Sequence, residues 1–427
     1  MSTTSGYTKC AACGKNPPRP TLICGDCREG LDLDGRQDRT PYCTTQCRQL
    51  DLTNHQKQCG RANRRKQIYR AGRLLQLTFY HFRDLSFDLK IDRVEEHDRR
   101  MVLYDGEYPK TRGFNLYSLP LPFTIGDKYG RAILSFQACT EASTHFYKLS
   151  EKLLTGMGDR YSTVDLTIDT SICALKRVAF DGKAIADISA HIVLSVETVD
   201  GDAFVFDISG AQFGQPCPVL PLQYFMDLYR KPEIKFVSKF GSAHSRNIPM
   251  MECILEDPEK DVGALALQAH MARALNECVE PWEEKREMSF NELLNSPRPR
   301  FDKLAKDFFS VAYDSIVKGA KILEHFTEVV DVGQLIQMLD PVPLIPRPST
   351  VLVTNNVEGS TMYQLWIAQH RARIQTQRGP VWWANHEPEL KNGGGIIVHL
   401  HEGSEPDEEA MIEAASAFLE EYCGHSG

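Results

Sequence analysis

The sequence predicts an α+β protein in which a small N-terminal metal-binding module precedes a larger body of mixed helices and strands. Three observations lead to this fold class. They are paired cysteines with a histidine in the first 59 residues, a strand–turn–strand pattern at 188–209, and helical spacing of apolar residues in several segments. With 427 residues and 42% apolar content, the chain is long enough for one or two cored domains beyond the module.

The N-terminal module contains seven cysteines and one histidine, arranged as four pairs. The pairs are Cys10-x2-Cys13, Cys24-x2-Cys27, Cys43-x3-Cys47 and His55-x3-Cys59. Zinc takes four tetrahedral sulfur or nitrogen ligands, and two side chains a few residues apart occupy one edge of such a tetrahedron. Eight ligands therefore fill two closed structural zinc sites and leave no position for a catalytic water. A disulfide cluster or a chance grouping explains the order and the intervals less well.

The four pairs, with Tyr42 directly before the third, resemble a MYND-type zinc finger. The resemblance implies that the pairs alternate between two zinc ions, which gives the sets Cys10, Cys13, Cys43, Cys47 and Cys24, Cys27, His55, Cys59. It also implies a protein partner, and a short proline-containing peptide is the kind of ligand that MYND fingers bind. Asp51 fits the family pattern, whereas Arg48 and Leu52 stand where the family usually has Gln and Trp.

Charge and composition favour a protein partner over nucleic acid. Residues 1–60 carry eight Lys/Arg and six Asp/Glu, and zinc-bound thiolates make the loaded finger slightly negative; the whole chain has a formal charge of −8. We expect no membrane association, because the sequence has neither a run of ~20 apolar residues nor a signal-peptide pattern. Thiolate zinc sites need a reducing compartment, so we expect the protein in the cytoplasm or the nucleus.

Beyond the finger, the sequence indicates four further segments. They are an α+β domain at 61–255 with the hairpin at 188–209, a helical segment at 256–340, a proline-rich linker at 341–348, and a C-terminal α+β segment at 349–427 with an acidic tail; the finger itself is 1–60. Within them, helices are expected at 61–83, 131–156, 262–281, 301–327, 357–377 and 407–422, and strands at 161–169, 188–199, 202–209 and 395–401.

The stretch 61–83 carries seven basic residues and no acidic one. One interpretation is a nuclear-import or RNA-contact surface; the other, which we favour, is a helix face beside an acidic neighbour. The tail at 379–427 has ten acidic residues and a single basic one, so it is one candidate for that neighbour.

The hairpin contains the clearest pattern that could belong to an enzyme. His191 lies at the start of one strand and Asp207 at the end of the next, with Asp200-Gly201 at the turn between them. A carboxylate that orients a histidine is the basic half of a nucleophilic triad. The pattern resembles the His–Asp hairpin of transglutaminase-like and papain-like proteins, which implies Cys139 as nucleophile. The predicted helix places Cys139 about two turns from its start.

The segment from Asp207 to Gly214 and the following Pro218-Val-Leu-Pro-Leu also resemble a block of uncharacterised fungal MYND proteins. We therefore expect a zinc-binding intracellular adaptor or regulatory protein that recruits a protein partner through its finger. The alternative is a cysteine-dependent hydrolase or acyl transferase that uses Cys139, His191 and Asp207. Of the two, the sequence favours the protein that is not an enzyme.

Overall fold

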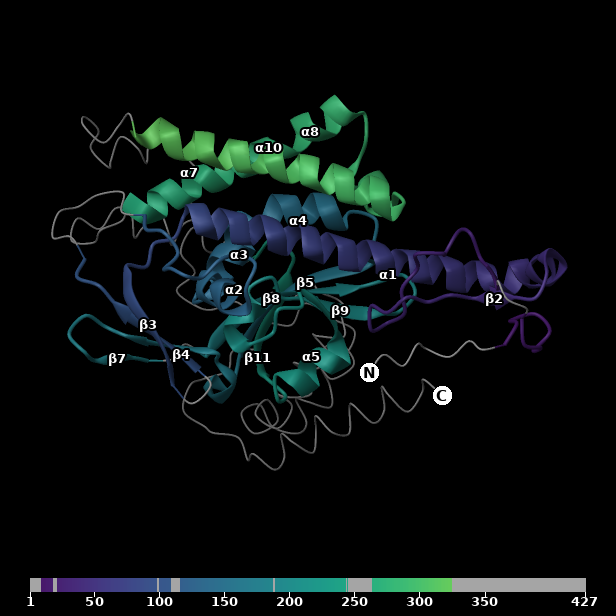
Figure 1. Cartoon of the computed structure of the whole chain (residues 1–427), viewed down its shortest axis with the longest axis horizontal. Helices are drawn as coiled ribbons and strands as arrows, with labels where there is room; N and C mark the ends of the chain where they lie inside the picture. Colours follow the sequence, from purple (N-terminus) through teal and green to yellow (C-terminus); the bar gives the residue numbers. More distant parts are fainter. Residues whose placement is uncertain are drawn as a thin grey trace, which may run out of the picture.

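The computed structural model describes residues 9–17, 21–97, 100–108, 116–186, 189–242, 244 and 263–324. A single long helix, α1 (Thr45–Leu85), crosses the molecule, with a β-rich body on one side and a layer of helices on the other (Figure 1). The α+β class is therefore confirmed. Within the described residues, every helix is too short or too polar to cross a bilayer. The proline-rich run, the acidic tail and the elements expected after 348 lie outside the described residues.

The finger occupies the N-terminal end of α1 and has little apolar core. Two short strands, β1 (Leu22–Ile23) and β2 (Pro41–Tyr42), pair antiparallel. Thr44 caps α1 by accepting a hydrogen bond from the Cys47 N–H. The buried apolar cluster consists of Cys10, Cys24, Cys27, Tyr42 and Ala62. A cluster this small, made mostly of thiols, buries little apolar surface to stabilise the finger.

Helix α1 is longer than the helix expected at 61–83, because it begins inside the finger and continues without a break into the body. The boundary expected after residue 60 therefore falls within one rigid element. The middle of α1 lies very close to the sheet: a Cβ on Gly72 would sit 2.1 Å from Val219 Cγ2. Only glycine fits at this crossing without movement of its neighbour.

The body is built around a five-stranded antiparallel sheet in the order β10-β9-β8-β5-β11. Its strands are β10 (Val219–Pro221), β9 (Ala203–Phe206), β8 (Ala190–Glu197), β5 (Arg160–Thr167) and β11 (Glu233–Lys239). The strands expected at 161–169, 188–199 and 202–209 are present as β5, β8 and β9, and β8 and β9 form the expected hairpin. Phe204 and Phe206 pack into the larger core with α1, whereas Val205 belongs to a smaller core with helix α5 (Leu222–Leu228).

A second sheet, which the sequence did not reveal, has the order β3-β4-β6-β7, and β4 and β6 run parallel. Its strands are β3 (Ile91–His97), β4 (Arg100–Asp105), β6 (Leu175–Val178) and β7 (Ala184–Ile185). Two short 3-10 helices, η1 (Thr170–Ile172) and η2 (Gly210–Phe213), lie in the connections, and η2 directly follows the hairpin.

The single helix expected at 131–156 is wrong, because three short helices replace it: α2 (Lys128–Ser135), α3 (Cys139–His145) and α4 (Tyr147–Leu154). The first break occurs at Gln137, a non-glycine residue with φ of 56°, which right-handed helix cannot accommodate. Cys139 is therefore the first residue of α3, and its expected place two turns inside a helix is wrong.

The C-terminal part of the described chain forms the helical layer beside α1 (Figure 1). It contains α7 (Gly263–Glu277), α8 (Val279–Arg286), α9 (Phe290–Asn295) and α10 (Arg298–Glu324). The helices expected at 262–281 and 301–327 correspond to α7 with the start of α8, and to α10. Trp282, Phe290 and Phe308 form a buried aromatic cluster between them. Ser289 and Glu292 form a capping box that starts α9.

Candidate metal centre and thiol site

The more buried group of candidate metal ligands comes from two segments of the finger. Cys24, Cys27, His55 and Cys59 offer one donor atom each, all within 4.8 Å of one another. Cys27 Sγ lies 3.2 Å from His55 Nε2. The tetrahedron edge expected from ordinary Zn–S and Zn–N bond lengths is ~3.6 Å, so the spacing of these donors suits one zinc-sized ion. His55 and Cys59 are four residues apart on α1 and therefore share one helix face.

The second group lies at the other end of the finger. Cys10, Cys13 and Cys47 bring their sulfurs within 4.8 Å of one another. Cys43 lies beside them, with its sulfur 3.7 Å from Cys13 Sγ and its N–H donating to Cys10 Sγ. The first and third pairs therefore meet at one point and the second and fourth at another, which is the alternating order that the MYND resemblance implies.

The chemistry of both donor sets fits a closed metal site. Burial, together with the neighbouring thiols Cys24 and Cys59, raises the pKa of Cys27. Crowded thiolates of this kind are stable only when a cation neutralises them, and soft sulfur ligands with imidazole suit zinc. A bound ion would join the loops before α1 to α1 itself and so supply the folding energy that the small core lacks. The first set has four donors, and the second has three, with Cys43 beside them as a fourth.

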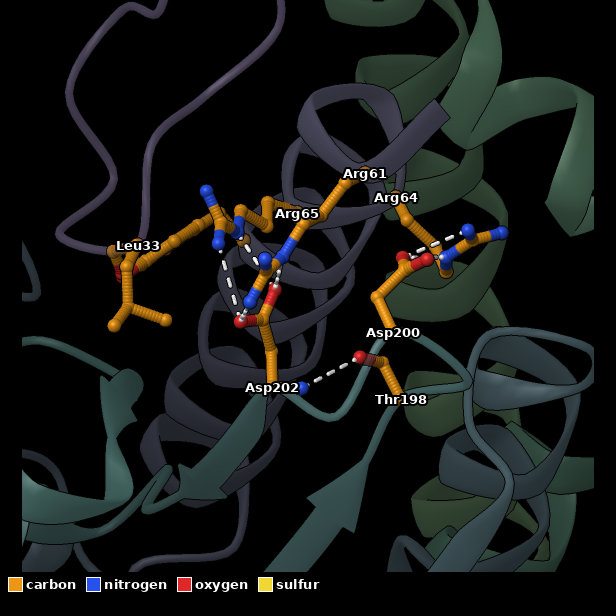
Figure 2. A network of polar contacts seen from close by, with 8 residues as sticks. Leu33, Arg61, Arg64, Arg65, Thr198, Asp200 and Asp202 are labelled. Atoms are coloured by element: carbon orange, nitrogen blue, oxygen red, sulfur yellow. Dashed lines mark hydrogen bonds and ion pairs between the residues drawn. The ribbon is translucent and has the colours of Figure 1, made fainter. Parts of the chain in front are cut away.

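The basic stretch of α1 lies against the turn between β8 and β9. Arg61 and Arg65 both bind the carboxylate of Asp202, and Arg64 binds Asp200 at 2.7 Å (Figure 2). Burial alone would raise the pKa of Asp202, but hydrogen bonds from Arg61 and Arg65 outweigh it and hold the pKa below its usual range. This favours a helix face beside an acidic neighbour. The neighbour for these three arginines is the hairpin turn.

The structure brings the three residues of the candidate triad together. His191 Nε2 lies 3.0 Å from Asp207 Oδ2, and both side chains are almost completely buried. Cys139 lines the same pocket as the imidazole, and its sulfur lies 3.9 Å from the Ala190 carbonyl oxygen; neither ring nitrogen of His191 makes a hydrogen bond within the described residues. Burial alone would lower the pKa of His191, but the Asp207 carboxylate and the Cys139 thiol outweigh it and raise this pKa above its usual range. The arrangement is that of a thiol, a base and an orienting carboxylate.

The thiol and the imidazole both line a pocket of about 270 Å³. Its wall comes from the loop before α3 and from neighbouring parts of β5, β8 and β11. Gln212, on η2, also lines the pocket, and its Oε1 accepts a hydrogen bond from the Gln137 N–H. The segment that follows Asp207 therefore holds the loop that leads to Cys139. Lys235, at the irregularity in β11, is another lining residue.

Strained backbone gathers near this site. Of the four non-glycine residues with positive φ among the described residues, Gln137 lies two positions before Cys139, and Arg230 and Lys231 directly follow Tyr229. The Tyr229 hydroxyl donates a hydrogen bond to Asp207. Each such conformation costs ~1–3 kcal/mol and persists only where the surroundings enforce it, often at functional sites.

Sequence reasoning missed two residues of this site. Gln212 belongs to the 207–214 block, so its position just after the acid was an available signal. The sequence has no such signal for Tyr229, because nothing in the pattern at 222–230 distinguishes it from an ordinary core aromatic residue. Cys173, the other cysteine shortly before His191, packs among the buried apolar residues of the smaller core.

Comparisons with protein-family models, with curated proteins and with solved structures find no match for this chain.

Proposed function

We propose that this protein is a zinc-binding adaptor or regulatory protein of the MYND type that recruits a protein partner through its finger. The observation that carries the proposal is the two compact donor groups, each supplied by two ligand pairs from different parts of the finger. Closed sites of this kind stabilise a fold and do not perform chemistry. We propose two zinc ions, and a reducing location in the cytoplasm or the nucleus that keeps the thiolates available.

The finger also has an apolar surface suited to a partner. Leu50 and Leu52, near the start of α1, are 75% and 59% exposed. We propose that these two leucines contribute to the surface that the partner covers. Leu52 stands where the MYND pattern usually has Trp, so the choice of a proline-containing peptide as the ligand class rests on the resemblance of the ligand pairs and not on this residue.

The test uses the full chain and an array of synthetic proline-containing peptides. We expect the wild-type protein to bind a subset of them and the variant Leu50→Asp/Leu52→Asp to lose this binding while retaining two zinc ions by native mass spectrometry. Leu121→Asp is the matched control, because Leu121 is 92% exposed and lies in the body. Equal binding by both variants, or no binding by the wild type, would contradict the proposal.

A second candidate function, a cysteine-dependent hydrolase or acyl transferase, is favoured by the Cys139–His191–Asp207 arrangement beside a pocket. His191 would take the Cys139 proton, and the sulfur would attack a carbonyl carbon to form a thioester. The bond to the leaving group would break as His191 returned the proton to it. Water or another nucleophile would then cleave the thioester and regenerate the thiol.

An activated ester such as p-nitrophenyl acetate tests this second function. We expect mass spectrometry to find an acetyl group on Cys139, and Cys139→Ser to abolish both acetylation and burst release of p-nitrophenol. Cys217→Ser is the control, because Cys217 is exposed and lies outside the pocket lining. Acetylation that stays the same in Cys139→Ser would exclude Cys139 as the nucleophile.

A further inference from the structure

A fourth buried residue contacts the acid of the candidate triad. The Tyr229 hydroxyl donates a 2.5 Å hydrogen bond to Asp207 Oδ2, the oxygen that also lies 3.0 Å from His191 Nε2. We propose that Tyr229 is a positioning residue that shares the negative charge of Asp207 with His191 and so sets how firmly the histidine holds its proton. This inference rests on the thiol function proposed for the same site.

A hydroxyl that donates to a carboxylate forms a charge-assisted hydrogen bond, which is roughly twice as strong as a bond between neutral groups. Asp207 and Tyr229 are 2% and 0% exposed, so bulk solvent does not reach this oxygen. At the other carboxylate oxygen, the Ser209 hydroxyl is a longer contact of 3.5 Å. Tyr229 is therefore the strongest neutral donor to Asp207.

The chain around Tyr229 is shaped to hold its hydroxyl in this place. Tyr229 is the C-cap residue directly after α5, and the next two residues, Arg230 and Lys231, both have positive φ. Arg230 is held by Asp169 and Ser171, with which it makes side-chain contacts of 3.0 and 2.9 Å. Without this strained turn, the chain after α5 would leave in another direction. Strain next to a buried polar contact supports a role beyond packing.

The aromatic ring is fixed as well. Phe213 and Phe225 pack against the Tyr229 ring, and the ring lies nearly parallel to the His191 imidazole at 15°. Burial first, and the Asp207 charge second, raise the pKa of Tyr229 well above its usual range. The hydroxyl therefore stays protonated and acts as a hydrogen-bond donor.

The consequence for catalysis follows from the charges near His191. Asp207 lies 3.0 Å from His191 Nε2, Tyr229 acts through Asp207, and Cys139, Asp165 and Lys235 line the same pocket. Without the hydroxyl, the Asp207 charge would be balanced mainly by His191, which would bind its proton more tightly. The imidazolium would still form beside the thiolate, but it would be a weaker acid toward a departing amine or alcohol.

Tyr229→Phe in the full chain tests the inference, with Tyr224→Phe as control, because Tyr224 lies on the same helix and is 54% exposed. We expect NMR titration of ¹³C-labelled histidine, with His191 assigned by His191→Gln, to show a pKa higher by about one unit in Tyr229→Phe. We expect alkylation of Cys139 by iodoacetamide to persist, because that reaction needs no proton donor. Acyl transfer from an alkyl ester should slow about tenfold. Tyr224→Phe should match the wild type.

An unchanged or lowered His191 pKa in folded Tyr229→Phe would overturn the inference even if the wild type is active. A wild-type protein whose Cys139 accepts no acyl group would overturn the thiol function and the inference with it. If Tyr229→Phe does not fold, Ser209→Ala replaces it, because it removes the weaker donor from the same carboxylate. A smaller upward shift of the His191 pKa would then support the inference, and no shift would overturn it.

Discussion

Replacing Asp202 tests whether the arginine contacts of α1 contribute more to the free energy of unfolding than ordinary surface ion pairs do. The Asp202 side chain is 4% exposed and binds Arg65, which is 13% exposed, and Arg61, which is 44% exposed. A hydrogen bond to a charged group contributes ~1.5–3 kcal/mol. The Arg61 pair must be discounted for solvent screening, and asparagine keeps one neutral acceptor. We expect Asp202→Asn to lower the free energy of unfolding by about 2 kcal/mol.

The assay is urea denaturation near neutral pH, followed by circular dichroism, with Asp200→Asn as the matched control. Asp200 lies in the same turn, but its pair with Arg64 is 24% and 28% exposed. We expect that substitution to cost less than about 1 kcal/mol. Equal losses in the two variants would refute the reasoning, because burial would then not distinguish the two carboxylates.

The contacts of Asp202 with Arg61 and Arg65 also predict that stability depends on pH. The folded-state pKa of Asp202 is lowered, so its contribution to stability is fully present above the unfolded-state pKa of about 3.9. It is lost as the pH falls through the folded-state pKa. Wild-type stability should therefore fall more steeply in this acid range than that of Asp202→Asn, and parallel curves would show that the carboxylate pKa is not lowered.

Three further predictions concern the α1–sheet contact, the finger and the thiol site. Gly72→Ala should lower the free energy of unfolding by about 1–3 kcal/mol, measured by denaturation, because the new Cβ would meet Val219 Cγ2. Adding Val219→Ala should recover part of this loss. If it recovers nothing, the contact with Val219 is not the cause. Cys27→Ser should reduce the zinc content from two ions per chain to one by native mass spectrometry, whereas Cys173→Ser, outside the finger, should keep both. Asp207→Asn should slow ester-dependent acylation of Cys139 by at least about tenfold, measured as the burst rate; an unchanged rate would show that the carboxylate does not orient the base.

Several features could be predicted from the sequence because the interactions that produce them are local. The spacing of the cysteine pairs allows two ligands to share one metal, and the alternating order came from the family resemblance. Asp200-Gly201 between β-branched runs predicted the hairpin, since Gly201 adopts the positive φ of 77° that this turn requires. The hairpin in turn predicted that His191 and Asp207 would meet.

Other features follow from long-range packing and had no local signal. A continuous apolar pattern at 131–156 predicted one helix, but tertiary contacts divide it: the Gln137 N–H bonds to Gln212, 75 positions away, and the chain takes a left-handed conformation there. This difference moved Cys139 from the middle of a helix to its start. The arginines of α1 likewise find Asp200 and Asp202 more than 130 positions away.

By itself, the sequence determined the α+β class, the ligand pairs of the finger, and the hairpin that carries the base and the acid, because each depends on residues close together in the chain. Only the tertiary structure decided that α1 joins the finger to the body as one helix, and that the hairpin turn binds Arg61, Arg64 and Arg65. It also decided that Cys139 and Tyr229 meet at the His191–Asp207 pair. Those contacts depend on how helices and sheets pack, and packing is settled by the free energy of the whole fold.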